Sequence, residues 1–177
     1  GILGVNIGKN FATPVVHANQ DYLYCLRQVY PFADYVVINI SSPNTPGLRA
    51  LQLGDQLTHL LSAIKEAEGS LSTQHQKIVP IFVKISPDMQ EDELAVFCEE
   101  IVRYQITGVI ATNTTLSRKG VENSAFAGEA GGLSGQPLFD LSTKTLSHLK
   151  EKLAKHSVTL IGVGGISSPE QAMAKFD

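Results

Sequence analysis

The sequence predicts an α/β protein built on a parallel sheet, and it favours a (β/α)8 barrel over an open doubly wound sheet. Short runs rich in valine and isoleucine alternate with helical patterns along the 177 residues, and this alternation is typical of parallel strands joined by right-handed crossovers. The runs are almost continuously apolar, as strands buried on both faces are. Polar residues follow successive runs, and a barrel would gather them around one axis.

The expected strands are five short runs, at residues 3–7, 35–40, 79–85, 108–112 and 159–163. They recur at roughly 30- to 50-residue intervals, and each interval has room for a strand and a returning helix. A closed barrel needs eight such units and about 250 residues. We therefore expect an incomplete barrel, and both ends of the chain look as if they were cut from a longer protein.

Apolar residues at helical spacing lie between the expected strands. The clearest patterns run over residues 57–64, 94–102 and 146–153. Asp88 with Glu91 could form a capping box before the second of these helices. Ser168, Pro169 and Gln171 have the order of a cap, a first helical residue and a box partner, which predicts a further helix near the end of the chain.

Composition narrows the classes of function. A hydrophobic fraction of 43% and a charged fraction of 18% support a packed core. A formal net charge of −3 argues against a general nucleic-acid binder. Cys25 and Cys98 lie in helix-like stretches without CxxC spacing, so we expect buried, reduced thiols and no metal site. No apolar run reaches the roughly 18–20 residues that would span a bilayer.

The densest polar segment follows the second strand and reads Asn39-Ile-Ser-Ser-Pro-Asn-Thr-Pro-Gly-Leu-Arg49. Turn-forming residues dominate it, so an ordinary turn is one interpretation. Asn39, however, lies within the apolar strand pattern, and a buried amide needs partners for its carbonyl and its amino group. A planar, amide-rich ligand could supply them. The stretch at residues 44–56 could close over such a ligand.

Lys84 interrupts the third strand, where it stands between Val83 and Ile85. A buried ammonium without a partner is costly. One interpretation is that the side chain reaches water at the end of the strand. The other is that it faces a negative charge, such as that of a phosphate, an enolate or a reduced flavin.

Two glycine-rich loops are candidates for a phosphate site. Gly162-Val-Gly-Gly165 ends the fifth strand and is followed by the expected helix start at Ser168, and Gly131-Gly-Leu-Ser-Gly135 is a second glycine-rich loop. Glycine lets the backbone approach a phosphate closely, and helix N–H groups bind anions. Either loop could be only a turn, because the GxGxxG and P-loop fingerprints are both absent.

Five ordered motifs of the chain resemble those of the dihydroorotate dehydrogenases. They are Asn39-x-Ser-Ser-Pro-Asn-Thr-Pro-Gly, Val83-Lys-Ile-x-Pro-Asp, Thr112-Asn-Thr-Thr, Gly131-Gly-Leu-Ser-Gly and Gly162-Val-Gly-Gly. The resemblance spans residues 1–177 and is greatest to class 2, the membrane-associated, quinone-linked enzymes. It implies that the chain is a partial FMN-binding (β/α)8 TIM barrel covering about strands three to seven. The first two strands, the last strand and the N-terminal membrane-binding segment would lie outside it.

The resemblance also implies an activity and a set of site residues. The activity is FMN-dependent oxidation of (S)-dihydroorotate to orotate in de novo pyrimidine biosynthesis, with a quinone as electron acceptor. Ser42 matches the general base of class 2, where class 1 enzymes carry cysteine, and the hydride would pass to N5 of FMN. The implied substrate contacts are Asn39, Asn44, Asn113 and Thr114. The implied FMN contacts are Asn6, Lys84, Thr112, Ser134, Gly135, Gly164 and Gly165.

Class 2 further implies peripheral attachment to the cytoplasmic face of the bacterial inner membrane, or alternatively to the mitochondrial inner membrane, through a segment outside this chain. Two other functions stay open, namely another FMN barrel oxidoreductase acting on a dihydropyrimidine and a binding module for a phosphate ligand. Those other oxidoreductases usually carry cysteine at the position of Ser42. The presence of both Ser42 and Lys84 argues against a binding module that has lost its chemistry.

Overall fold

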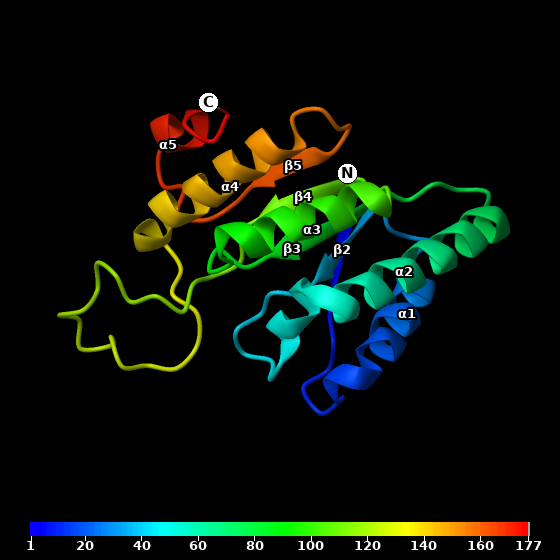
Figure 1. The fold of residues 1–177 in the computed structure, drawn as a ribbon, viewed down its shortest axis with the longest axis horizontal. Helices are drawn as coiled ribbons and strands as arrows, with labels where there is room; N and C mark the ends of the chain where they lie inside the picture. The colour runs from blue at the N-terminus through cyan, green and yellow to red at the C-terminus, as the bar shows by residue number, and fades with distance from the viewer. Residues whose placement is uncertain (177) are drawn as a thin grey trace.

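The computed structural model describes residues 1–176 and confirms a parallel sheet flanked by helices (Figure 1). Each predicted strand is present and is one or two residues shorter than expected. The strands are β1 (Gly4–Ile7), β2 (Tyr35–Asn39), β3 (Ile81–Ile85), β4 (Gly108–Ala111) and β5 (Thr159–Gly162). The α-helices are α1 (Ala18–Val29), α2 (Gly54–His75), α3 (Glu91–Arg103), α4 (Phe139–Leu153) and α5 (Pro169–Met173). Short 3-10 helices are η1 (Val15–His17), η2 (Leu48–Gln52) and η3 (Gln136–Leu138).

The order of the strands supports the barrel over the doubly wound sheet. The strands are all parallel and pair in chain order, β1-β2-β3-β4-β5. A doubly wound sheet departs from chain order at its switch point, whereas a barrel adds each strand beside the previous one. Helices α1 to α4 lie along one face of the sheet, as Figure 1 shows, which is the outer face of a barrel.

The two faces of the sheet are packed differently because side chains alternate along each strand. On the helix-covered face, residues such as Ile38 and Val83 join the helices in the main hydrophobic core. On the inner face, Val37, Phe82 and Ile110 form a small separate cluster. Asn39 pairs in register with Lys84, two residues beyond Val37 and Phe82. Both polar side chains therefore belong to the inner face, at the carboxyl edge of the sheet.

Gly108 makes room for an aromatic ring on this inner face. A Cβ at this position would lie 2.5 Å from a ring carbon of Phe82 and would overlap the Thr159 carbonyl. We expect Gly108→Ala in the full-length protein to lower the free energy of unfolding by about 1–3 kcal/mol, because the backbone has to shift. Gly69→Ala in α2, whose Cβ would meet nothing within 4 Å, should instead raise it by about 0.5–1 kcal/mol. Urea denaturation measures both, and equal midpoints for the two variants would contradict the packing argument.

The predicted capping box before α3 is wrong. The helix begins after Gln90, whose backbone N–H donates to the Glu93 carboxylate at 2.8 Å. Asp88 stands two residues before this cap, and its carboxylate accepts hydrogen bonds from other loops instead. The sequence shows correctly that Asp88 lies near the start of a helix. It does not show that Arg49, which is distant in sequence, binds the Asp88 carboxylate.

The predicted start of α5 is correct in its main feature. Ser168 is the N-cap, and its hydroxyl accepts the backbone N–H of Gln171 at 3.2 Å. The side chain of Gln171 accepts from the backbone of Ser167 at 2.7 Å, one residue earlier than a capping box requires.

Neither cysteine takes part in a disulfide or a metal cluster. Both thiols are free, and burial raises the pKa of Cys98 to about 11. Cys25 is only half-buried, so the expectation of two buried thiols holds for Cys98 alone. Within residues 1–176, no group of three or more His, Cys, Asp or Glu side chains could hold a metal ion. No helix in this part of the chain has the length and apolar character needed to cross a bilayer.

Candidate functional site

Amide and hydroxyl side chains meet where β2, β3 and β4 end. The Asn113 amide nitrogen donates to the Asn39 side-chain oxygen at 3.2 Å and lies 3.1 Å from the Ser41 hydroxyl. The Ser41 hydroxyl in turn lies 2.7 Å from the Lys84 carbonyl oxygen, to which it can donate. Three consecutive strands are therefore linked at one edge, as the sequence predicts for Asn39, Lys84 and Asn113. Ser41, which is fully buried at the centre of these contacts, was not among the predicted site residues.

Two nitrogen donors at this edge have no hydrogen-bond partner within residues 1–176, namely the Asn39 amide nitrogen and the Lys84 ammonium. Both side chains are half-buried and belong to the inner face of the sheet. Because these two donors are free to bind, this part of the inner face is suited to a ligand that accepts hydrogen bonds and carries negative charge.

Tyr22 supports the end of β2 from the helix-covered side. Its side chain is fully buried, and its hydroxyl donates to the Asn39 carbonyl oxygen at 2.7 Å. Burial raises the pKa of Tyr22 well above its ordinary value, so the phenol stays protonated and keeps donating at physiological pH. The backbone of Asn39 is thus held from outside the sheet while its side chain belongs to the inner face.

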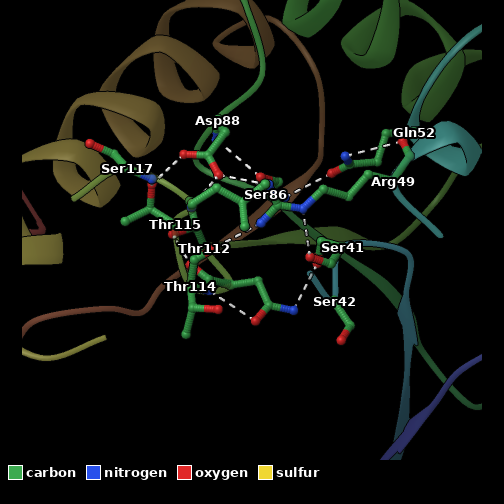
Figure 2. Close-up of polar contacts among 12 residues, drawn as sticks. Ser41, Ser42, Arg49, Gln52, Ser86, Asp88, Thr112, Thr114, Thr115 and Ser117 are labelled. Atoms are coloured by element: carbon green, nitrogen blue, oxygen red, sulfur yellow. Dashed lines mark hydrogen bonds and ion pairs between the residues drawn. The ribbon is translucent and has the colours of Figure 1, made fainter. Parts of the chain in front are cut away.

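Ser42 lies beside the amide cluster in the loop after β2. Figure 2 shows it next to Ser41 at the edge of a polar network. The Ser42 hydroxyl accepts the Asn44 backbone N–H at 3.3 Å, and no histidine or carboxylate within residues 1–176 bonds to it. Asn44 is exposed, and its side-chain oxygen lies 3.2 Å from the position that a Cβ on Gly131 would take. The glycine-rich loop at residues 131–135 therefore lies beside the loop that carries Ser42.

The same glycine loop also packs on the residues that follow β4. Thr115 and Leu133 form an antiparallel bridge, which brings residues 131–135 back to the carboxyl edge of the sheet. A Cβ on Gly132 would overlap the Thr114 side chain, so glycine is required there for this approach. The predicted substrate residue Thr114 is therefore covered by a loop that the sequence assigned to the cofactor.

The second pair of glycines packs against the start of α4. Gly164 and Gly165 have φ angles of 117° and 74°, and a Cβ on Gly165 would lie 2.5 Å from the Phe139 backbone nitrogen. The Ser142 hydroxyl lies 2.9 Å from the Gly164 carbonyl oxygen, and the Lys175 ammonium lies 2.6 Å from that hydroxyl. Burial lowers the pKa of Lys175. A close backbone approach and a cation thus occur together at the end of β5.

The remaining predicted residues are more dispersed. Thr112 is buried directly after β4, and its hydroxyl donates to the carbonyl of the next residue at 2.8 Å. Ser134 and Gly135 are exposed and lead into η3 and α4. Asn6 is exposed on the inner face of β1 and has no hydrogen-bond partner within residues 1–176. The structure does not bring Asn6, Ser134 or Gly135 into contact with the amide cluster.

The predicted closing stretch at residues 44–56 is largely anchored. Its middle forms η2, in which Leu48 and Leu51 are buried. The Gln52 side-chain oxygen accepts the backbone N–H of Ser86 at 2.8 Å, and α2 begins at Gly54. The middle of the stretch belongs to the packed core, so the hypothesis of closure over a ligand applies to residues 44–47.

An arginine and an aspartate that the sequence prediction missed join three loops (Figure 2). We call Arg49 and Asp88 the three-loop clamp. Arg49 Nη1 pairs with the Asp88 carboxylate at 2.7 Å, while Nε and Nη2 donate to the Ser41 carbonyl at 3.2 Å and the Thr114 carbonyl at 3.0 Å. The sequence did contain an indication of their role. Arg49 ends the motif that begins at Asn39. Asp88 ends the motif that begins at Val83, and other residues of both motifs were assigned to the site.

The fold and this site together define a class of protein, a barrel of the (β/α) type whose polar groups converge at the carboxyl ends of parallel strands. A family model described as dihydroorotate dehydrogenase matches residues 1–177, and the chain belongs to this family.

The following relatives share one description, and each matches this chain over nearly its whole length. Proteins named dihydroorotate dehydrogenase (quinone) from Shewanella amazonensis and Idiomarina loihiensis are 53% and 54% identical over 176 residues, which is 99% of this chain and 52% of each relative. The crystal structure of DHODH from Eimeria tenella in complex with ferulenol is similar with a TM-score of 0.90 and 36% identity, over 98% of this chain and 49% of that chain. The chain thus spans about half the length of these relatives.

Proposed function

We propose that residues 1–177 are a partial FMN-binding barrel domain of a quinone-linked dihydroorotate dehydrogenase, which oxidises (S)-dihydroorotate to orotate in pyrimidine biosynthesis. The observation that carries the proposal is the convergence of the Asn39–Asn113 amide pair and the Lys84 ammonium at one edge of the sheet. Membership of the family and the names of the relatives support it.

The amide cluster would bind the pyrimidine. The side chains of Asn39, Asn44, Asn113 and Thr114 offer both donors and acceptors, and a planar ring with alternating carbonyl and N–H groups matches such a set. Asn39 and Asn113 hydrogen-bond to each other at 3.2 Å, so substrate would take over part of this contact. Their main contribution would be orientation, because holding the reacting atoms in position lowers the barrier substantially.

Ser42 would remove the proton from C5 of the substrate. A serine hydroxyl is a weak base, and no histidine or carboxylate within residues 1–176 bonds to it. Its proton would therefore leave through water or a neighbouring hydroxyl, and Thr45, three residues further along the chain, is a candidate member of this relay. Such a relay depends on position and on exclusion of bulk water more than on the pKa of the hydroxyl.

The residues present fit FMN in two regions. The Lys84 ammonium on the inner face would face the ring where negative charge accumulates. Thr112, which is buried directly after β4, is assigned to the same cofactor. Gly164 and Gly165 follow β5 with φ angles of 117° and 74° and pack against the start of α4, and we assign their backbone to the phosphate end of the cofactor. Asn6, Ser134 and Gly135 are the further contacts that we assign to the cofactor. When bound, FMN would supply the hydride acceptor, its N5 atom.

The proposal also includes the electron acceptor, which would be a quinone. It further includes peripheral attachment to the cytoplasmic face of a bacterial inner membrane, through a segment outside this chain. Its support is that the relatives are bacterial proteins named dihydroorotate dehydrogenase (quinone).

The test is anaerobic addition of dihydroorotate to the flavin-loaded, full-length protein. We expect the flavin absorbance to bleach and one orotate to form per flavin. Dihydrouracil, which lacks the carboxylate, is the matched comparison. Bleaching by dihydrouracil but not by dihydroorotate would favour another FMN barrel oxidoreductase, and a protein that binds a phosphate ligand without flavin would favour the binding module.

A further inference from the structure

In the three-loop clamp, the guanidinium of Arg49 donates hydrogen bonds to three different loops. One nitrogen faces Asp88 after β3, one faces the Ser41 carbonyl after β2, and one faces the Thr114 carbonyl after β4. The side chains of Arg49 and Asp88 are only 21% and 24% exposed. Partial burial limits competition from water, so these charge-assisted bonds are stronger than those of a surface pair.

Asp88 continues the connection toward the loop after β4. Its carboxylate accepts hydrogen bonds from the Thr115 hydroxyl and from the Leu116 backbone N–H, the latter at 2.9 Å. The backbone N–H of Asp88 donates to the Ser86 hydroxyl at 3.1 Å, which fixes the turn after β3. The loop after β4 is therefore held twice, through Arg49 at Thr114 and through Asp88 at Thr115 and Leu116.

The points that the clamp holds are adjacent to the residues proposed to act on substrate. Ser41 immediately precedes Ser42, and Thr114 immediately follows Asn113. The distance between the proposed base and the proposed pyrimidine contacts is thus held by hydrogen bonds through this guanidinium as well as by the direct contacts of Asn113 with Asn39 and Ser41. A displacement of about 1 Å in such an arrangement is enough to cost on the order of 100-fold in rate.

We propose that Arg49 and Asp88 are positioning residues, which hold the loop of Ser42 at a fixed separation from Asn113 and Thr114 without touching the reacting atoms. This inference rests on the proposed function. Arginine is required because its planar fork donates to Asp88 and to two carbonyls at once, whereas a lysine ammonium is a single point of charge on a flexible stem. Arg49→Lys therefore keeps the positive charge but removes the planar set of donors that bonds to Asp88 and to the two carbonyls.

The test compares Arg49→Lys and Asp88→Asn with Arg103→Lys in the full-length, flavin-loaded protein. Arg103 is a matched control, because it pairs with Glu100 on the same helix and its side chain is 66% exposed. We expect both clamp variants to keep their flavin and to lower the rate of anaerobic bleaching at saturating dihydroorotate by about 10- to 100-fold. The control should bleach at the wild-type rate.

Hydrogen exchange of the flavin-free protein gives a readout that does not depend on turnover. We expect faster exchange in Arg49→Lys within residues 40–48 and 112–117, and no change in either segment for Arg103→Lys. A wild-type bleaching rate in Arg49→Lys, a rate loss matched by flavin loss, or unchanged exchange would each overturn the inference. Failure of dihydroorotate to bleach the wild-type protein would instead overturn the proposed function, and the inference with it.

Discussion

Ser42→Ala should slow reduction of the flavin by dihydroorotate about 10²- to 10⁴-fold, which is the usual contribution of a positioned general base. The flavin content should not change, because within residues 1–176 the Ser42 hydroxyl makes a single hydrogen bond, accepted from the Asn44 backbone N–H at 3.3 Å. Stopped-flow measurement of flavin absorbance under anaerobic conditions gives the rate. Ser62→Ala, at an exposed position of α2, is the control.

Ser42→Cys extends this test to pH. A thiol has an ordinary pKa of about 8.5, so its basic form accumulates as the pH rises toward that value. The rate of the cysteine variant should therefore increase with pH through this range and exceed that of Ser42→Ala. A Ser42→Ala enzyme with a near-normal rate of flavin reduction would remove Ser42 from the role of base.

The strands were predictable because their signal is local. Runs such as residues 35–40 and 79–85 are continuously apolar, and burial on both faces of a parallel sheet requires that composition. That the strands are parallel followed from the rules for crossovers, whereas their order, which distinguishes a barrel from a doubly wound sheet, came from the structure. The ends of elements were less certain, as the wrong capping box at Asp88 shows, because a capping residue competes with every other donor that folding brings near it.

The site was predictable where a polar residue interrupts an apolar pattern. Asn39 and Lys84 stand out in this way, and they are neighbours in the sheet. Ser41 and Arg49 do not stand out, since serine is an ordinary turn residue and arginine is usually solvated. Their importance comes from contacts across 43 and 65 residues of sequence, and only the fold reveals such contacts.

Lys84→Ala should weaken FMN binding about 10- to 100-fold, or slow flavin reduction by a similar factor. The Lys84 ammonium is half-buried on the inner face and has no hydrogen-bond partner within residues 1–176, so its charge is free to act on a ligand. A charge-assisted hydrogen bond contributes about 1.5–3 kcal/mol, and about 1.4 kcal/mol corresponds to a tenfold change. Titration of flavin fluorescence gives the affinity, and anaerobic bleaching gives the rate.

The same change should leave the flavin-free protein as stable as the wild type or make it more stable, because it removes a charge that is partly buried without a partner. Thermal unfolding of the flavin-free form measures this. Lys144→Ala, at an exposed position of α4, controls for the loss of one positive charge. Bound flavin and a bleaching rate that both stay at wild-type values in Lys84→Ala would show that this ammonium does not act on the cofactor. A large loss of stability in the flavin-free form would show instead that its role is structural.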